Sequence, residues 1–205
     1  MPSINRNYYQ ILLYKIFEAS NGYATTNEIE RAGISRIYLT KLTNEGSIER
    51  IKRGVYYWPN TLLTSHSGLV AASLIVPKGV VCLLSALSYY GLTTYNPRET
   101  SVAIQRETKV SLPKYPPIKL YYFSEKHFKA GIRKVKIGKR TVKIYSEEKT
   151  LCDCLKYRNQ VGLDIFKDGL KEYLRKPGRN LKTLIKFAKI NNVEKDMKTY
   201  LEVLV

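Results

Sequence analysis

Apolar residues recur every three or four positions at the start of the chain. Tyr8, Ile11, Leu12 and Phe17 follow this spacing, which predicts an amphipathic helix over residues 6–19. The Asn-Gly pair at 21–22 is a typical helix stop. A run of short elements is predicted directly after it.

These short elements are separated by glycines and by side chains that cap helices. In order, they are a strand at 23–24, a helix from the N-cap Thr26 to Arg31, a turn at Gly33, a helix from the N-cap Ser35 to about Glu45, and strands at 47–52 and 55–58 joined by Arg53-Gly54. Helix, strand, helix, tight turn, helix and hairpin is the order of a winged helix-turn-helix. The pattern therefore predicts this fold for the first domain, residues 1–58.

The third predicted helix of this domain has two different faces. At about 100° per residue, Leu39 and Leu42 point inward, and the opposite face is polar and basic. Arg and Lys match guanine, Asn matches adenine, and Thr and Ile match the thymine methyl group in the major groove. The candidate DNA-binding residues are Thr26, Ser35, Arg36, Ile37, Thr40, Lys41 and Asn44 on the helices, and Arg50, Lys52 and Arg53 on the wing. A solvated helix face or a protein-interaction module is the alternative.

Beyond a linker that begins at Pro59, periodicity predicts a second domain over residues 65–205. Its expected elements are helices at 65–76 and 80–90, strands at 101–105, 118–123, 132–137 and 141–145, and four amphipathic helices after Ser146. This order predicts an α+β fold, with a small, mainly antiparallel sheet flanked by helices.

Charge makes a polyanion the expected partner. The formal net charge is +18; residues 1–58 contribute +3 of it, which leaves +15 for residues 59–205. Such an excess is typical of proteins that bind nucleic acid. Charged and apolar residues alternate along the predicted hairpin, which places several cations on one face of the sheet. This face could follow a phosphate backbone. A solvated sheet face explains the pattern equally well. These cations are Lys134, Lys136, Lys139, Arg140 and Lys143.

Other classes of function find little support. Three cysteines are an odd number, and with only two histidines they do not give the four ligands of a zinc site. We therefore expect reduced, buried thiols. We expect no bound metal and no cofactor. No run of about eighteen apolar residues or signal peptide is seen, which favours a cytoplasmic protein. Glu147 and Lys149 resemble half of a nuclease metal site, but helix capping by Ser146 explains the acidic first turn more simply. We therefore expect no catalytic residue and no enzyme.

Three segments carry a resemblance to a known family. Val81–Thr93 and Ile144–Leu155 resemble core helices of the AbiEi family, and Arg53-Gly54-Val55-Tyr56 resembles the end of its wing. AbiEi proteins are antitoxins and transcriptional autoregulators of type IV toxin–antitoxin operons that act in abortive phage infection. The resemblance extends from about Gly22 to Leu174 and is weakest in the last thirty residues.

The resemblance implies a division of labour. The winged helix would repress its own operon by binding inverted repeats in double-stranded DNA. The second domain would counter a nucleotidyltransferase toxin, without a tight complex between the two proteins. Two alternatives stay open: a winged-helix protein whose second domain is a metal-dependent nuclease using Glu147 and Lys149, and a ligand-sensing repressor.

Overall fold

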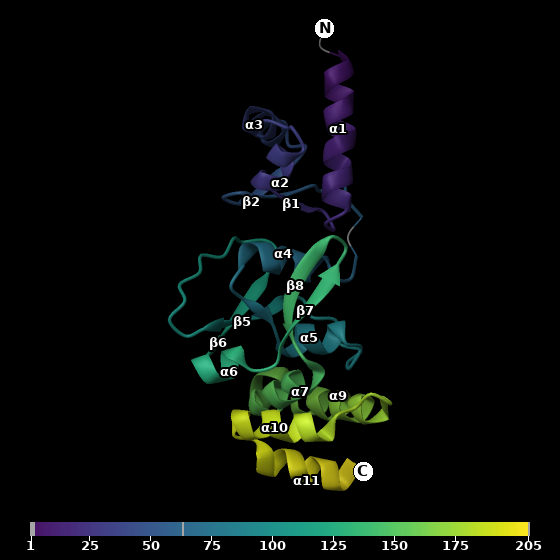
Figure 1. The fold of residues 1–205 in the computed structure, drawn as a ribbon, viewed down its shortest axis with the longest axis vertical. Helices are drawn as coiled ribbons and strands as arrows, with labels where there is room; N and C mark the ends of the chain where they lie inside the picture. The colour runs from purple at the N-terminus through teal and green to yellow at the C-terminus, as the bar shows by residue number, and fades with distance from the viewer. Residues whose placement is uncertain (1–2, 63, 205) are drawn as a thin grey trace.

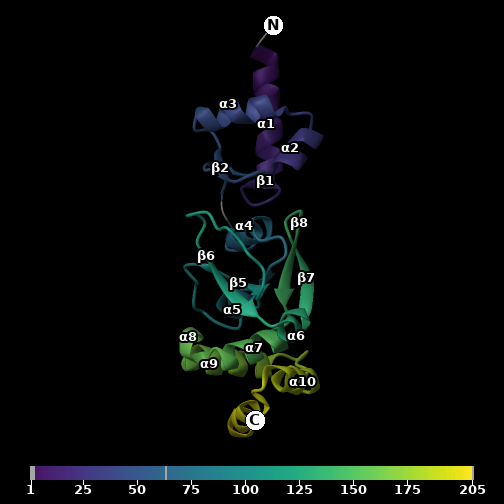
Figure 2. The same ribbon diagram turned by 90° about the vertical axis from the view of Figure 1, so that its left-hand side faces the viewer.

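The computed structural model describes residues 3–62 and 64–204. Its elements form three tiers along the long axis of the molecule (Figure 1). A mostly helical N-terminal unit with a small sheet lies at one end, a five-stranded sheet lies in the middle, and a stack of helices ends at the C-terminus. The same three tiers are seen after a quarter turn (Figure 2).

The N-terminal unit has the predicted order of elements. They are α1 (Ser3–Glu18), β1 (Tyr23–Thr25), α2 (Thr26–Arg31), α3 (Arg36–Asn44), β2 (Glu49–Lys52) and β3 (Val55–Tyr57). The strands form an antiparallel sheet in the order β1-β3-β2. Leu39 and Leu42 of α3 are buried in a core with Phe17, as the helical projection predicts. The winged-helix order is therefore confirmed.

One cap in this unit differs from the prediction. The N-cap of α2 is Thr25, and Thr26 is the first residue of the helix. Thr25 and Glu28 form a capping box, in which each side chain bonds the backbone N–H of the other residue. Two adjacent threonines offer the same local signal, and the position of Glu28 selects the first of them.

The middle tier is a mixed sheet. Its elements are α4 (Ser67–Ile75), β4 (Val80–Val81), α5 (Leu83–Tyr89), β5 (Thr100–Gln105), β6 (Ile118–Phe123), α6 (Glu125–Lys129), β7 (Ile132–Ile137) and β8 (Arg140–Tyr145). The strand order is β6-β5-β4-β8-β7. The β4–β5 and β7–β8 pairs are antiparallel, whereas β4–β8 and β5–β6 are parallel. The prediction of a mainly antiparallel sheet was wrong, because pairing between strands distant in sequence is not visible in local pattern.

The predicted helix at 80–90 was also wrong at its start. Val80 and Val81 form the central strand β4, and the helix begins at Leu83. A short apolar run fits a buried strand as well as a buried helix, and β-branched valines favour the strand. Both faces of the sheet are covered: Val81 and Val102 pack with α4, while Val80 and Ala103 pack with α5 and α7. Helices flank the sheet, as predicted.

The last tier consists of helices that extend away from the sheet (Figure 2). They are α7 (Glu147–Lys156), α8 (Arg158–Val161), α9 (Leu163–Arg175), α10 (Leu181–Asn191) and α11 (Glu194–Leu204). The four predicted amphipathic stripes correspond to α7, α9, α10 and α11. Within the described ranges 3–62 and 64–204, no helix has the length and apolar character needed to cross a bilayer.

The N-terminal unit is packed directly onto the middle tier. The rings of Tyr23 and Tyr57 stack with centroids 5.0 Å apart. Both rings belong to the apolar cluster that contains Leu69 and Val70 of α4. Burial of two aromatic side chains in a shared core holds the two units in one relative position.

Candidate nucleic-acid interface

A groove lies between the start of α2, α3 and the wing, the hairpin formed by β2 and β3. Its volume is about 420 Å³. The groove is lined by Thr26, Asn27, Arg36, Thr40, Arg50, Arg53, Gly54 and Tyr56. We call it the α2–α3 groove. It brings together five of the predicted DNA-binding residues from three elements: Thr26, Arg36, Thr40, Arg50 and Arg53.

Local backbone chemistry fixes the walls of this groove. The capping box starts α2 at Thr26, and the Thr26 N–H donates to the Gly54 carbonyl at 3.1 Å, which ties the helix to the wing turn. Ser35 caps α3, because its Oγ accepts a hydrogen bond from the Tyr38 N–H at 3.4 Å. The structure thus gives Ser35, a predicted site residue, a capping role at the exposed start of α3.

The outward face of α3 is exposed along its length. Arg36, Ile37, Thr40, Lys41 and Asn44 are all exposed. The Ile37 side chain is 83% exposed and belongs to none of the apolar clusters that the described residues form. Exposed isoleucine next to Arg, Lys and Asn suits a helix that meets base edges and thymine methyl groups.

Arg36 is held by a neighbour within the helix-turn-helix. Its Nη2 donates to Glu30 Oε2 at 3.1 Å, and its Nε donates to the other carboxylate oxygen. The Arg36 side chain is nevertheless 71% exposed. Hydrogen bonds from Arg36 lower the pKa of the Glu30 carboxylate, so the pair is ionised near neutral pH. Exposed pairs of this kind are weak, so DNA can compete for the guanidinium.

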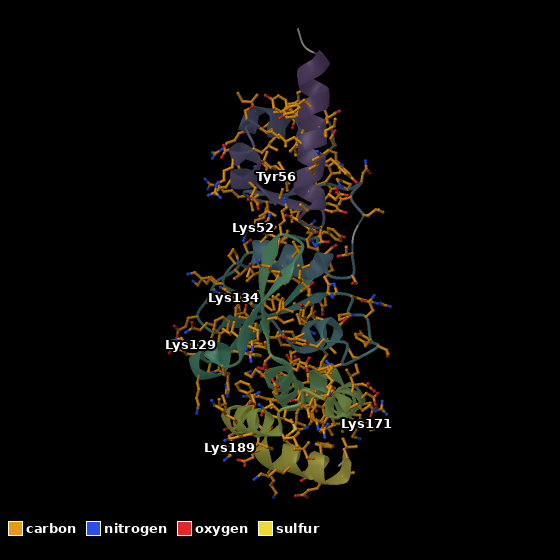
Figure 3. All side chains as sticks on the ribbon, turned by 45° about the vertical axis from the view of Figure 1, so that its right-hand side comes forward. Lys52, Tyr56, Lys129, Lys134, Lys171 and Lys189 are labelled. Atoms are coloured by element: carbon orange, nitrogen blue, oxygen red, sulfur yellow. The ribbon has the colours of Figure 1, made fainter. Side chains whose placement is uncertain are left out.

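The three predicted cationic side chains of the wing point in two directions. Arg50 and Arg53 are exposed and line the α2–α3 groove. Lys52 instead donates from Nζ to the Ile75 carbonyl, at the end of α4, at 3.1 Å. Figure 3 labels Lys52 at the junction between the N-terminal unit and the middle tier. The register of the β2–β3 pair shifts between Arg50 and Lys52, which separates the two side chains.

Three residues of the groove were not among the predicted ones: Asn27, Gly54 and Tyr56. Tyr56 lies opposite Arg50 in the β2–β3 ladder, between the buried residues Val55 and Tyr57. Strict alternation in a strand could have placed Tyr56 on the outer face. Asn27 is exposed and is the second residue of α2, because Thr25 is the N-cap. The sequence prediction placed the cap at Thr26 and so shifted the start of this helix by one residue.

The predicted basic face on the β7–β8 hairpin is split by the structure. Lys134 lies opposite Lys143, and Lys136 lies opposite Thr141, so these three lysines share one face. Arg140 lies opposite Ile137 on the other face, where it is 14% exposed and forms an ion pair with Glu28 of α2. The prediction of one face with five cations was wrong, because Arg140 is turned toward the N-terminal unit.

The hairpin turn itself also contacts the N-terminal unit. The Lys139 N–H donates to the Ala19 carbonyl at 3.0 Å, while the Lys139 side chain is exposed. Lys143 donates from Nζ to the Pro77 carbonyl at 3.3 Å. Of the five predicted cations, the side chains of Lys134, Lys136 and Lys139 make no hydrogen bond or ion pair with residues 3–62 or 64–204.

The Glu147–Lys149 pair does not form an open metal site. Ser146 caps α7, as predicted, with its Oγ accepting from the Lys149 N–H. Lys149 is fully buried, pairs with Asp153, and lies 4.6 Å from the centroid of the Tyr145 ring. Glu147 pairs with Lys176 at 2.9 Å. In the part of the chain that the structure describes, no three His, Cys, Asp or Glu residues are grouped so as to hold a metal ion.

The three cysteines are free and buried, as predicted. Burial raises the pKa of each thiol, which keeps all three protonated and unreactive near neutral pH.

A second hollow, of about 310 Å³, lies beside α6 and α7. Arg106 and Lys156 line it together with Tyr122, Ser124 and His127. Ser124 Oγ and His127 Nδ1 are 2.9 Å apart, and His127 Nε2 contacts the Ile190 carbonyl. Burial lowers the pKa of His127, so its ring is neutral near pH 7.

The N-terminal unit matches a known protein family. Residues 12–59 match the family model AbiEi_4, described as "Transcriptional regulator, AbiEi antitoxin". None of the curated proteins matches the chain. The crystal structure of the RV2827C protein from Mycobacterium tuberculosis is similar in fold, with a TM-score of 0.52 and 10% identity over 95% of this chain and 81% of that one.

The family match ends at residue 59, so it does not include the two core segments of the second unit whose resemblance to AbiEi was noted from sequence. It does include every element of the N-terminal unit from the middle of α1 to β3. The N-terminal part of this chain therefore carries a domain of the AbiEi antitoxin and transcriptional regulator family.

Proposed function

We propose that this protein is the antitoxin of a type IV toxin–antitoxin system and represses its own operon by binding inverted repeats in the promoter. The observation that carries the proposal is the α2–α3 groove within the AbiEi-type domain, where Arg36, Arg50 and Arg53 converge. Among the described residues, no buried carboxylate pairs with these three guanidinium groups, so they are suited to bind the phosphates of a nucleic acid.

In the proposed complex, α3 lies in the major groove of the operator. Arg36 and Lys41 contact guanine, Asn44 contacts adenine, and Ile37 packs on a thymine methyl group. Arg50 and Arg53 on the wing contact phosphates on one side, and Thr26 and Asn27 at the start of α2 contact phosphates on the other. Base contacts supply specificity, whereas the phosphate contacts set the register.

The second domain, residues 65–205, is proposed to counter a nucleotidyltransferase toxin, without forming a tight complex with it. The support is the resemblance of Val81–Thr93 and Ile144–Leu155 to AbiEi core segments. In the structure these segments contain α5 and all but the last residue of α7. The two helices pack in one apolar cluster, and each segment begins in a strand of the central sheet, β4 or β8. In this proposal the protein acts by binding and catalyses no reaction.

Two experiments test the proposal. Binding titrations with the promoter fragment upstream of the gene should show protection of an inverted repeat, with much weaker binding to a scrambled duplex of equal length. Co-expression with a nucleotidyltransferase encoded beside the gene should restore growth that this toxin alone arrests. Equal affinity for operator and scrambled DNA would refute the repressor role, and failure to restore growth would refute the antitoxin role.

A ligand-sensing repressor is the second candidate. The observation that favours it is the 310 Å³ hollow, which combines aromatic walls with Arg106 and Lys156. Its size is at the lower end for small-molecule sites. Growth protection without any effect of small metabolites on operator binding would favour the antitoxin over this alternative.

A further inference from the structure

One wall of the α2–α3 groove is held by a residue that is far away in the sequence. Arg140, at the start of β8, pairs through Nη2 with the Glu28 carboxylate, 112 positions earlier in the chain. We propose that Arg140 is a positioning residue for DNA binding: it sets the first turn of α2 through Glu28 and does not contact DNA itself. This inference rests on the proposed repressor function.

Glu28 joins Arg140 to the groove by direct hydrogen bonds. Its Oε2 accepts from the Thr25 N–H at 2.9 Å, from the Thr25 hydroxyl at 2.7 Å, and from Arg140. Burial by itself raises the pKa of Glu28, but the Thr25 hydrogen bonds and the Arg140 charge lower it below its ordinary value. The carboxylate is therefore ionised and has three donors at one oxygen.

The next two residues after Thr25 form one wall of the groove. Thr26 and Asn27 line it, and the Thr26 N–H donates to the Gly54 carbonyl of the wing turn at 3.1 Å. Any rotation of the first turn of α2 would therefore move a groove wall and the wing turn together. Arg140 opposes that rotation because it holds Glu28 from outside the N-terminal unit.

The hairpin that carries Arg140 is fixed against the N-terminal unit. The Lys139 N–H bonds the Ala19 carbonyl at 3.0 Å. Gly138 has a φ of +56°, and a Cβ there would lie 2.7 Å from the Ala19 carbonyl oxygen. Only glycine fits so close an approach. Arg140 therefore projects from a rigid support rather than from a free loop.

The geometry also separates Arg140 from the residues that would contact phosphate. Arg140 is 14% exposed and does not line the α2–α3 groove, whereas Arg36 is 71% exposed and does. Removal of a phosphate contact weakens binding to every sequence and lowers the salt dependence. Removal of a positioning residue should instead weaken the contacts that depend on correct placement of α2, α3 and the wing.

The test uses the full-length protein with operator and scrambled duplexes. Arg140→Met and Glu28→Gln should each lower operator affinity by about three- to thirtyfold, which lies within the span of coupling energies between residues of one network. Affinity for the scrambled duplex should fall less than affinity for the operator. The slope of log K against log[salt] should change by much less than about 0.9, because Thr26 and Asn27 are uncharged and their displacement removes no charged phosphate contact. The double variant should be no worse than the weaker-binding single variant, and Arg140→Lys should recover part of the loss.

Arg133→Met is the matched control, because it removes an exposed arginine from the same hairpin that is not among the candidate phosphate contacts. It should leave the operator preference intact. The active fraction of each variant is measured by stoichiometric titration. Amide exchange should be faster in Arg140→Met than in the control at Thr26 and Glu28, whose N–H groups bond the Gly54 carbonyl and the Thr25 hydroxyl.

Three outcomes would overturn the inference. In the first, Arg140→Met weakens both duplexes equally and reduces the salt slope by about 0.9, the value for one lost phosphate contact. In the second, it changes neither affinity. In the third, the losses in the two single variants add in the double variant. If the wild-type protein does not prefer its operator, the proposed function fails as well, so the two failures are distinguishable.

Discussion

Arg36 and Glu30 form a two-point ion pair across the turn of the helix-turn-helix, six positions apart in sequence. The pair aligns the guanidinium at the edge of the α2–α3 groove while leaving most of it in contact with water. To bind the edge of a guanine, Arg36 must give up the Glu30 carboxylate as its acceptor and take the O6 and N7 atoms of the base instead. Glu30 therefore competes with the operator for Arg36.

This competition gives the first prediction. Arg36→Ala and Lys41→Ala should each weaken operator binding about fivefold to a hundredfold, because each removes a base contact. Glu30→Ala should have a much smaller effect, or a slight gain in affinity, since it frees Arg36. Titration of the three variants against one promoter fragment measures these affinities. Equal affinity for all three would contradict the assignment of α3 to the major groove.

The second prediction concerns the separability of the two parts. Residues 65–205 have their own sheet and helices and should fold alone. They should unfold at a lower temperature than the full chain, because the partners of Tyr23 and Tyr57 become exposed. Expressed beside the toxin, residues 65–205 should retain some protection. Protection by residues 1–58 alone would contradict the proposed division of labour.

The third prediction concerns the charge outside the N-terminal unit. If Lys134, Lys136 and Lys143 follow the duplex, the full chain should have a steeper salt slope than residues 1–58, by about 0.9 for each phosphate. Lys136→Glu with Lys143→Glu should reduce this difference without changing base preference. Equal slopes for the full chain and the isolated domain would exclude this face from the DNA interface.

The fourth prediction concerns the buried ion pair. Lys149 and Asp153 are both buried, and Asn191 donates to Asp153 at 2.7 Å. Lys149→Met should lower the free energy of unfolding by about 3–5 kcal/mol, because it leaves a buried carboxylate without its counter-charge. Lys156→Met, at an exposed position on the same helix, is the control. Urea denaturation measures both; similar losses would show that the pair contributes little.

The fifth prediction is a pH dependence at Glu28. Its folded-state pKa lies below the ordinary value of 4.5. The stability that this carboxylate adds is therefore fully present above pH 4.5 and is lost as the pH falls through the folded-state pKa. The difference in unfolding free energy between wild type and Glu28→Gln should shrink below about pH 4.5. A difference that is independent of pH between 3 and 7 would contradict this assignment.

The order of elements in the N-terminal unit was predictable because its signals are local. Helical spacing marks α1, Gly33 and Ser35 mark the turn before α3, and strand alternation marks the wing. The exposed face of α3 followed from the burial of Leu39 and Leu42 alone. Capping of α7 by Ser146 was likewise a local feature.

The sequence by itself thus determined the helix-turn-helix, the position of its polar helix face, and the excess of positive charge. Tertiary structure alone decided that Val80 and Val81 are a central strand, because their partners, β5 and β8, lie far along the chain. It alone decided that Lys52 and Arg140 face the junction between units. The sequence around a lysine or an arginine is the same whether its side chain contacts a phosphate, a carbonyl or a carboxylate. Only the fold, which brings Ile75 and Glu28 beside them, determines which of these each side chain meets.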